Sequence, residues 1–327
     1  MSGTSARHHE PISLEVPSIW RRYELPTWAL AVVIYAGWFA VTWNYDALPG
    51  WLVFVLGGWL CAWHGSLQHE AVHGHPTRSD LVNELLVFPP LTLWYPYRVY
   101  RDTHLTHHRD QELTCPIKDP ESCYATPDDW ESMGAVGRGL RWILSTLAGR
   151  LIIGPFVTTF WLYRAGIVSI MQGDRRAITA WSLHVAGVAL VLTWVIAVCG
   201  IPVWAYLLFF AYPGMALTLL RSYAEHRPAE QVGHRTVINE AEWPLAVLFL
   251  NNNLHAVHHR EPGRPWYELP SRYRLMRDEV LAENGGFVQK GYRELARRFF
   301  VKPKDAPVHP YFQVLPAPET AAEASPR

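Results

Sequence analysis

Two long stretches almost without charge constrain this 327-residue chain more than any other feature. Between Glu24 and His69 the only charged side chain is Asp46, and residues 177–220 contain none. A turn signal, NYDALPG in the first stretch and CGIP in the second, divides each into two apolar parts of 17 to 19 residues. A helix needs about 20 such residues to cross the hydrocarbon core of a bilayer. The sequence therefore predicts an all-α integral membrane protein with two transmembrane helical hairpins, that is, four spans.

Composition favours this interpretation over its alternative, two buried helical pairs in a large soluble protein. Half of the residues are hydrophobic, only 18% are charged, and the 16 Trp are typical of a chain that meets both lipid and water. Lys and Arg together balance Asp and Glu at 29 each, so no bulk charge indicates a nucleic-acid partner.

The positions of Lys and Arg predict the orientation. Neither hairpin tip, near Asp46 or near Gly200, carries a basic residue, so the positive-inside rule places both termini and the middle region in the cytosol. We expect a multi-pass protein of a bacterial inner membrane, with its active site on the cytosolic face. The expected organisation is a cytosolic segment at 1–26, a membrane domain at 27–270 with spans at about 27–43, 50–67, 180–198 and 202–220, a cytosolic helical segment at 271–302, and a disordered tail at 303–327.

The middle region mixes polar and apolar pieces. Residues 87–97, VFPPLTLWYPY, are too short and too rich in proline to span, and they predict an interfacial or re-entrant segment. Thr126 followed by proline predicts a helix start, and this helix should run into the apolar residues 151–163 and lie in the membrane surface. A third full span over 151–163 is the alternative.

Histidines gather in three short clusters: HEAVHGH at 69–75, HLTHH at 104–108 and HAVHH at 255–259. The first follows the second span, the second lies in the middle region, and the third follows the fourth span, so all three emerge on one side of the membrane. Residues three or four apart share a helix face, and imidazole is a common ligand of iron, zinc, copper and nickel. These spacings predict a metal centre with the ligands His69, His73, His104, His107, His108, His255, His258 and His259. Eight imidazoles exceed the needs of one ion, so we expect two.

Two other classes of protein would also use such clusters. One is a zinc-dependent membrane enzyme, which metal analysis distinguishes. The other is a metal-binding transporter, but such a protein should carry its ligands at mid-membrane, whereas these clusters lie at the ends of spans.

The three histidine boxes, their order and the two hairpins resemble the membrane-bound fatty acid desaturase superfamily, which includes hydroxylases. The resemblance covers about residues 28–270 and implies a non-haem centre of two iron ions held almost wholly by histidines. The boxes carry the eight ligands named above, and His226 in RSYAEHR matches a further ligand of the superfamily. The run HGHPTRS, with His75 where many bacterial relatives have a small residue, resembles a bacterial subgroup that includes amino-acid-derived toxin desaturases.

Residues beside the boxes are candidates to hydrogen-bond the ligand histidines and fix their tautomers. Asn252 could instead cap the helix of the third box. The candidates are His75, Glu70, Asp102, Asp110, Glu225 and Asn252.

The resemblance implies that O2 and electrons are used to introduce a C=C bond into an acyl or alkyl chain, on a fatty acyl or a small amino-acid-derived substrate. Hydroxylation is the alternative outcome. The four cysteines show no iron–sulfur spacing, so we expect a separate electron donor, a ferredoxin or rubredoxin with its reductase. Basic residues after the third box are candidates for its docking surface, or for contact with membrane lipids: Arg272, Arg274, Arg277, Arg297 and Arg298.

Overall fold

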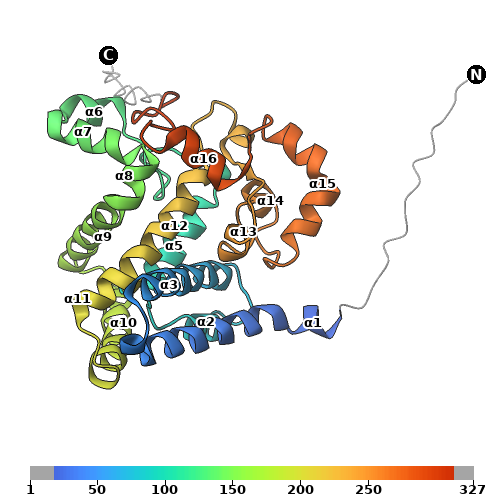
Figure 1. Cartoon of the computed structure of the whole chain (residues 1–327). Coiled ribbons are helices and arrows are strands. Elements are labelled where there is room, and N and C mark those ends of the chain that lie inside the picture. Colours follow the sequence, from blue (N-terminus) through green and yellow to red (C-terminus); the bar gives the residue numbers. More distant parts are fainter. Residues whose placement is uncertain (1–17, 313–327) are drawn as a thin grey trace, which may run out of the picture.

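The computed structural model describes residues 18–312, and almost all of its regular structure is helical (Figure 1). The first helices are α1 (Ile19–Arg22), α2 (Leu25–Trp43), α3 (Gly50–Val72), α4 (Asp80–Leu86) and α5 (Tyr97–His107). The middle helices are α6 (Pro127–Ser132), α7 (Ala135–Leu144), α8 (Leu147–Ile152), α9 (Gly154–Met171) and α10 (Arg175–Leu192). The last are α11 (Val203–Tyr206), α12 (Tyr212–Glu225), α13 (Leu245–Leu248), α14 (His255–Arg260), α15 (Leu269–Glu283) and α16 (Gly291–Phe299). Two short parallel strands, β1 (Ile238–Asn239) and β2 (Val288–Gln289), pair with each other.

Four helical segments of the described chain are long and apolar enough to cross a membrane, which confirms the predicted all-α membrane fold. The third and fourth spans each contain a π-helical stretch, at Thr193–Val198 after α10 and at Leu207–Ala211 between α11 and α12. The spans are Leu25–Trp43, Gly50–Val72, Arg175–Val198 and Val203–Glu225.

Close packing joins α3 to α12, the two spans that lead into the histidine clusters. A Cβ placed on Gly214 of α12 would lie 2.5 Å from the Cβ of Cys61 in α3, and one on Gly58 would lie 2.7 Å from the Cβ of Pro213. Small residues allow this approach, and van der Waals packing is the main attraction between helices in lipid. The contact fixes the end of α3 relative to the end of α12.

Residues 87–97 lie inside the bundle. Leu91 is almost fully buried, and its carbonyl accepts a hydrogen bond of 2.7 Å from the hydroxyl of Tyr206, which in turn accepts from the Trp38 indole at 2.9 Å. Irregular backbone is tolerated at membrane depth only where protein groups satisfy it, as they do here.

The middle region differs from the prediction of one helix that runs from Thr126 into residues 151–163. The structure has four helices there, α6 to α9 (Figure 1, green). Thr126 caps α6, and its hydroxyl accepts from the Asp129 amide at 3.0 Å. The chain restarts at Thr146, whose hydroxyl caps α8 by accepting from the Gly149 amide at 3.1 Å. Because Thr146 begins a new helix, α7 must end before it. A pattern of apolar residues alone does not show such an N-cap.

The segments after α12 form a polar cap on one side of the spans, where α13 to α16 gather (Figure 1). α15 and α16 fall almost wholly within residues 271–302, and between them Asn284 ends α15 and Gly285 and Gly286 adopt positive φ. Residues 303–312 are anchored to the middle region by backbone hydrogen bonds to Ser145 and Ala125, whereas residues 313–327 lie outside the described part.

Candidate metal centre

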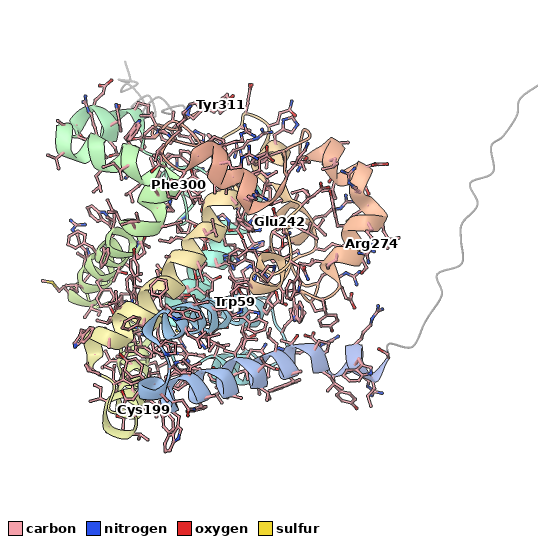
Figure 2. The ribbon with its side chains drawn as sticks, viewed as in Figure 1. Trp59, Cys199, Glu242, Arg274, Phe300 and Tyr311 are labelled. Atoms are coloured by element: carbon pink, nitrogen blue, oxygen red, sulfur yellow. The ribbon has the colours of Figure 1, made fainter. Side chains whose placement is uncertain are left out.

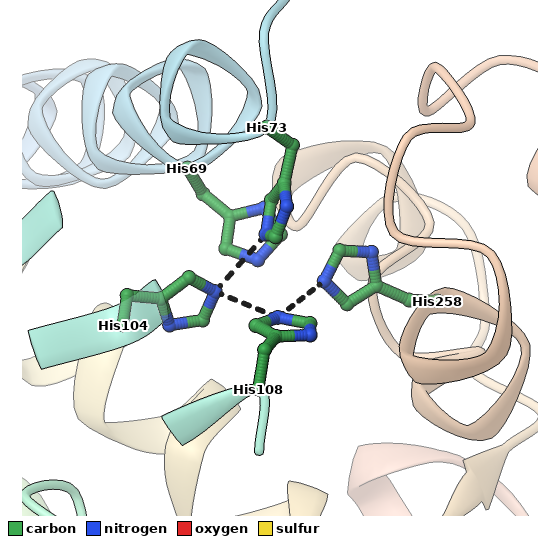
Figure 3. A group of neighbouring side chains, drawn as sticks. All are labelled: His69, His73, His104, His108 and His258. Atoms are coloured by element: carbon green, nitrogen blue, oxygen red, sulfur yellow. Dashed lines mark hydrogen bonds between the residues drawn. The ribbon is translucent and has the colours of Figure 1, made fainter. Parts of the chain in front are cut away.

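The first histidine box lies at the end of α3, away from the hairpin tip. His69 is in the last turn of the helix and His73 is its C-cap, so both rings point to one side of the helix end (Figure 3). His69 is 2% exposed, and its Nε2 has no hydrogen-bond partner. A buried imidazole nitrogen without a partner is costly unless a ligand binds it.

The second box ends α5. His104 and His108 are one turn apart and approach the first box: the Nε2 of His104 lies 3.2 Å from that of His73 and 3.1 Å from that of His108. His107 points elsewhere, with its Nε2 2.9 Å from the Nε2 of His226. At 3.6 residues per turn, adjacent positions differ by about 100° around the helix axis. The histidines of this box therefore point in two directions from the end of α5.

The third box, on α14, shows the same division with the roles exchanged. His255 and His259, one turn apart, join His226, and the Nε2 atoms of His255 and His226 are 2.9 Å apart. His258 turns toward the first box, with its ring centroid 4.6 Å from those of His69 and His73, and its Nε2 lies 3.1 Å from that of His108 in the second box. His226 itself follows α12 in extended backbone, which directs it across the end of the helix.

The structure thus brings the nine predicted ligands together as two groups, and within each group the potential ligand atoms all lie within 4.8 Å of one another. We call them group A and group B. Group A, most of which Figure 3 joins by dashed lines, is His69, His73, His104, His108 and His258. Group B is His107, His226, His255 and His259.

The geometry fits a metal ion in each group. Imidazole ligands about 2.0–2.1 Å from one ion lie about 3 Å apart when they are adjacent, which matches the Nε2 separations of 2.9 to 3.2 Å. The opposite ring atoms are already held: the Nδ1 atoms of His104 and His107 donate to Glu121 at 2.8 Å and to Asp119 at 2.9 Å. These bonds leave the Nε2 lone pairs facing one another, an arrangement that a cation stabilises.

Charge states support the same conclusion. Burial, then the neighbouring imidazoles His73 and His108, lower the pKa of His258 well below 6.5, so it is neutral and ready to bind a metal. Burial also lowers the pKa of His107, but the carboxylates of Glu121 and Asp119 outweigh it and raise this pKa to about 9. His107 therefore loses a proton when a metal binds near neutral pH.

The sequence model of the fatty acid desaturase family matches residues 45–291, which include all nine of these histidines. The chain belongs to this family. No curated protein matches the chain in a sequence comparison. The family and the four apolar helices make it a membrane protein with an oxidoreductase function of the desaturase type, and the two histidine groups make its centre a metal site.

Among the residues predicted to support the ligands, Glu225 and Asn252 lie next to His255 of group B. The amide of Asn252 donates to Glu225 at 2.9 Å, and its carbonyl lies 3.2 Å from the Nδ1 of His255. Glu225 also pairs with the buried Arg221 at 3.1 Å. The predicted capping role of Asn252 is wrong, because Leu254 occupies the N-cap of α14 and no side chain caps it.

Glu70 and His75 support the end of α3 in other ways. Glu70 lies 3.8 Å from the Nδ1 of His69 and accepts from the backbone amide of Trp266 at 3.0 Å, which ties the first box to the loop after the third. His75 belongs to neither group: its Nδ1 lies 2.6 Å from Glu24, at the start of α2.

Asp102 does not reach a ligand. It is exposed and pairs with Arg101 at 3.0 Å, because two residues before His104 the helix faces nearly the opposite way. The side chain of Asp110, the remaining candidate, lies outside the described part of the structure.

Asp119 and Glu121 were missed by the sequence analysis, although they hold two ligands. They lie 11 or more residues after the second box, in a loop whose path no periodic pattern predicts. Asp119 fixes this loop as well as His107, since it accepts from the amides of Thr114 at 2.8 Å and Glu121 at 2.9 Å. Two carboxylates in the short motif Asp-Pro-Glu, close after a histidine box, are the signal that could have indicated them.

The chain after α16 closes over group B. The ammonium of Lys304, almost buried, donates to the carbonyl of Tyr223 at 2.7 Å and to that of the ligand His226. Asp305 accepts from Tyr124 at 2.9 Å, and the ring of His309 lies 3.0 Å from the hydroxyl of Thr114. We call residues 300–309 the C-terminal strap. It joins the end of α12 to the loop that carries Asp119.

Proposed function

We propose that the chain is an O2-dependent di-iron desaturase that introduces a C=C bond into an acyl or alkyl chain. The observation that carries the proposal is the pair of buried imidazole groups in a member of the fatty acid desaturase family. Imidazole suits iron, copper, nickel and zinc, but zinc has no redox chemistry and would not serve an oxidation. Two iron ions bound to groups A and B would supply the redox chemistry that activates O2 and removes hydrogen.

The residues of the chain have three tasks in such a reaction. The imidazoles bind without adding charge, and the carboxylates of Asp119 and Glu121 hold two of them in the correct tautomer. Burial of the ligands excludes water, which protects a reactive site from side reactions. Position decides the outcome: a second hydrogen removal gives a double bond, whereas return of oxygen to the same carbon gives an alcohol.

Hydroxylation is therefore the second outcome of the same site. Desaturation takes two electrons and two protons from the substrate, and reduction of O2 to two waters requires two more of each. These must come from a reductant.

We propose that this reductant is a separate protein, a ferredoxin or rubredoxin. Arg274 on α15 and Arg297 on α16 are exposed on the polar cap beside the metal centre and offer it a basic docking surface (Figure 2 labels Arg274). Arg272, Arg277 and Arg298 contribute less, because each has an acidic partner, Glu261, Glu240 and Glu294 respectively. We also propose a location in a bacterial inner membrane, with the metal centre on the cytosolic side, an orientation that the basic residues of the cap favour.

Expression in a bacterial host that supplies a ferredoxin system, followed by mass spectrometry of the metabolites, tests the proposal. A product about 2 Da lighter than its precursor indicates desaturation, and one about 16 Da heavier indicates hydroxylation. Iron near two per chain and O2 uptake with reduced ferredoxin are expected. A purified, active protein that holds zinc alone would refute it.

A further inference from the structure

A cavity of about 1460 Å³ lies beside group A. Three separate segments line it: the start of the described chain through the first turn of α2, the residues that follow α3, and the loop between α14 and α15. His73, a ligand of group A, is part of its wall. A molecule in this cavity therefore lies next to the metal centre.

The charges in the cavity do not balance. Four guanidinium groups line it, those of Arg21, Arg22, Arg78 and Arg264, against the two carboxylates of Glu24 and Glu268. Glu268 lies 3.5 Å from Arg21 and 3.3 Å from Arg264, and Glu24 is bound by His75 at 2.6 Å. Neither carboxylate is left to neutralise Arg22 or Arg78.

Arg22 and Arg78 have no acidic partner within 4.0 Å among the described side chains. Arg22 lies over the ring of Tyr23, 5.6 Å from its centroid, and both arginines are exposed on the cavity side of the chain. A guanidinium group presents parallel N–H donors that match a carboxylate or a phosphate. Two such groups without a partner favour an anion.

The remaining wall is mixed, with the polar side chains of Ser18, His73, His75 and Thr77 beside an apolar part. Trp28, Pro76, Pro265 and Tyr267 line it together with Leu25. Ligand sites commonly combine apolar walls with a few polar groups that fix orientation. The cavity thus suits a molecule with an anionic end and an apolar part.

We propose that this cavity binds the anionic group of the substrate, a carboxylate or a phosphate, through the unpaired guanidinium groups of Arg22 and Arg78. The inference rests on the proposed function, since it assigns the cavity to the substrate of the same metal centre. Because His73 lines the same cavity, the anionic group and the carbon that reacts share one chamber. The substrate is then recognised by its charged end and not by an apolar chain alone.

Binding of a simple probe to the full-length, iron-loaded protein in phosphatidylcholine nanodiscs tests the proposal without turnover. Hexanoate is compared with hexanol, which has the same chain without the charge, by calorimetry in the absence of O2. We expect hexanoate to bind at least about tenfold more tightly, as a charge-assisted hydrogen bond is worth more than tenfold in affinity. The double variant Arg22→Gln/Arg78→Gln should lose this preference and bind hexanol unchanged.

Arg293→Gln is the matched control, an exposed arginine on α16 that does not line the cavity. It should bind hexanoate as the wild type does. Equal binding of hexanoate and hexanol by the wild type, or an unchanged preference in the double variant, overturns the proposal. Unchanged iron content in the double variant shows that any loss of binding does not reflect unfolding.

The same assay identifies the source of the anion. If phosphatidylglycerol in the nanodisc displaces hexanoate from both the wild type and the control variant, the anionic group belongs to a lipid. If phosphatidylglycerol does not affect hexanoate binding, the anionic group belongs to a free acid. Either result supports an anion site in the cavity. A failure of this assay with O2 uptake intact overturns the cavity assignment alone, whereas absent O2 uptake with selective hexanoate binding overturns the proposed function alone.

Discussion

The two imidazole groups share α5 and α14 but differ in their third helix, which is α3 for group A and α12 for group B, and in their surroundings. Group A has five histidines, and His73 opens onto a large charged cavity. Group B has four histidines and is enclosed by Asp119, Glu225 and the C-terminal strap. Group A thus faces the side from which a substrate can approach, whereas group B is enclosed by the protein.

The difference suggests a division of labour. A reaction centre needs access for its substrate. It also needs metal ligands that keep their positions while the substrate binds. Group A has five histidines and opens onto the cavity. Group B has four histidines, which neighbouring residues enclose more fully. Each of the following predictions tests whether the two groups can be altered separately.

The largest effect should come from loss of a ligand. His226→Ala leaves group B with three imidazoles, and His73→Ala leaves group A with four, which is enough for a tetrahedral site. We expect the metal content to fall from about two to about one ion per chain in His226→Ala and to stay nearer two in His73→Ala. Product formation should fall at least about 100-fold in both, and metal analysis separates them.

His234→Ala serves as the control, since His234 is in neither group. It should keep both ions and full activity. Two ions retained in His226→Ala would show that His226 is not a ligand.

Loss of a carboxylate should come next. Asp119→Asn keeps an acceptor for the Nδ1 of His107 but removes the charge. We expect the metal affinity of group B to fall by about 10- to 100-fold, while group A is unchanged. The pKa of His107 should also fall from about 9, so the rise in affinity between pH 7 and pH 9, which reflects loss of its proton, should be weaker in the variant. Competition with a chelator at several pH values measures both effects.

Asp102→Asn is the matched control on the exposed side of α5 and should bind both ions as the wild type does. If Asp119→Asn weakened both groups equally, the two positions would not be independent.

The C-terminal strap should have a smaller effect that is again confined to group B. Lys304→Met removes the donor that holds the carbonyls of Tyr223 and His226. A hydrogen bond from a charged group is worth about 1.5–3 kcal/mol, so we expect loss of one ion to a chelator to be about tenfold faster or more. Stopped-flow chelation records the two ions as separate phases.

Lys302→Met, at an exposed position two residues earlier, should leave both phases unchanged. Lys304→Arg keeps the charge and should restore most of the slow phase. An equal acceleration of both phases would mean that the strap stabilises the whole fold and not group B.

Much of the architecture could be predicted because the bilayer imposes it. A span must be long, apolar and helical, and this requirement is visible in the composition of any window of the chain. The nine ligands were also visible, as eight box histidines and His226, because ligand spacing on a helix is a local property. How the boxes are shared between groups A and B was not, since each box was expected to form one helical face.

The sharing follows from helix geometry combined with position. In the second box His104 and His108 join group A and His107 joins group B, whereas in the third box His255 and His259 join group B and His258 joins group A. The relative placement of α5 and α14 decides which histidines of each box join group A and which join group B. Asp119 and Lys304 were missed for the same reason: loops bring them to the site, and tertiary contacts determine the path of a loop.

The smallest predicted effect concerns the cavity side of group A. Burial lowers the pKa of His75, but the hydrogen bond to Glu24 and the nearby Glu70 outweigh this and raise it above 6.5. A raised pKa in the folded state stabilises the fold below pH 6.5, and this contribution is lost as the pH rises through the raised value. Glu24→Gln should therefore lower the free energy of unfolding by about 1–2 kcal/mol at pH 6 and by less at pH 8.5, with both metal ions retained. Denaturant titrations at the two pH values measure this, and an equal loss at both would show that the pair stabilises the fold without its charge. Loss of metal in Glu24→Gln would instead show that group A depends on its surroundings as group B does.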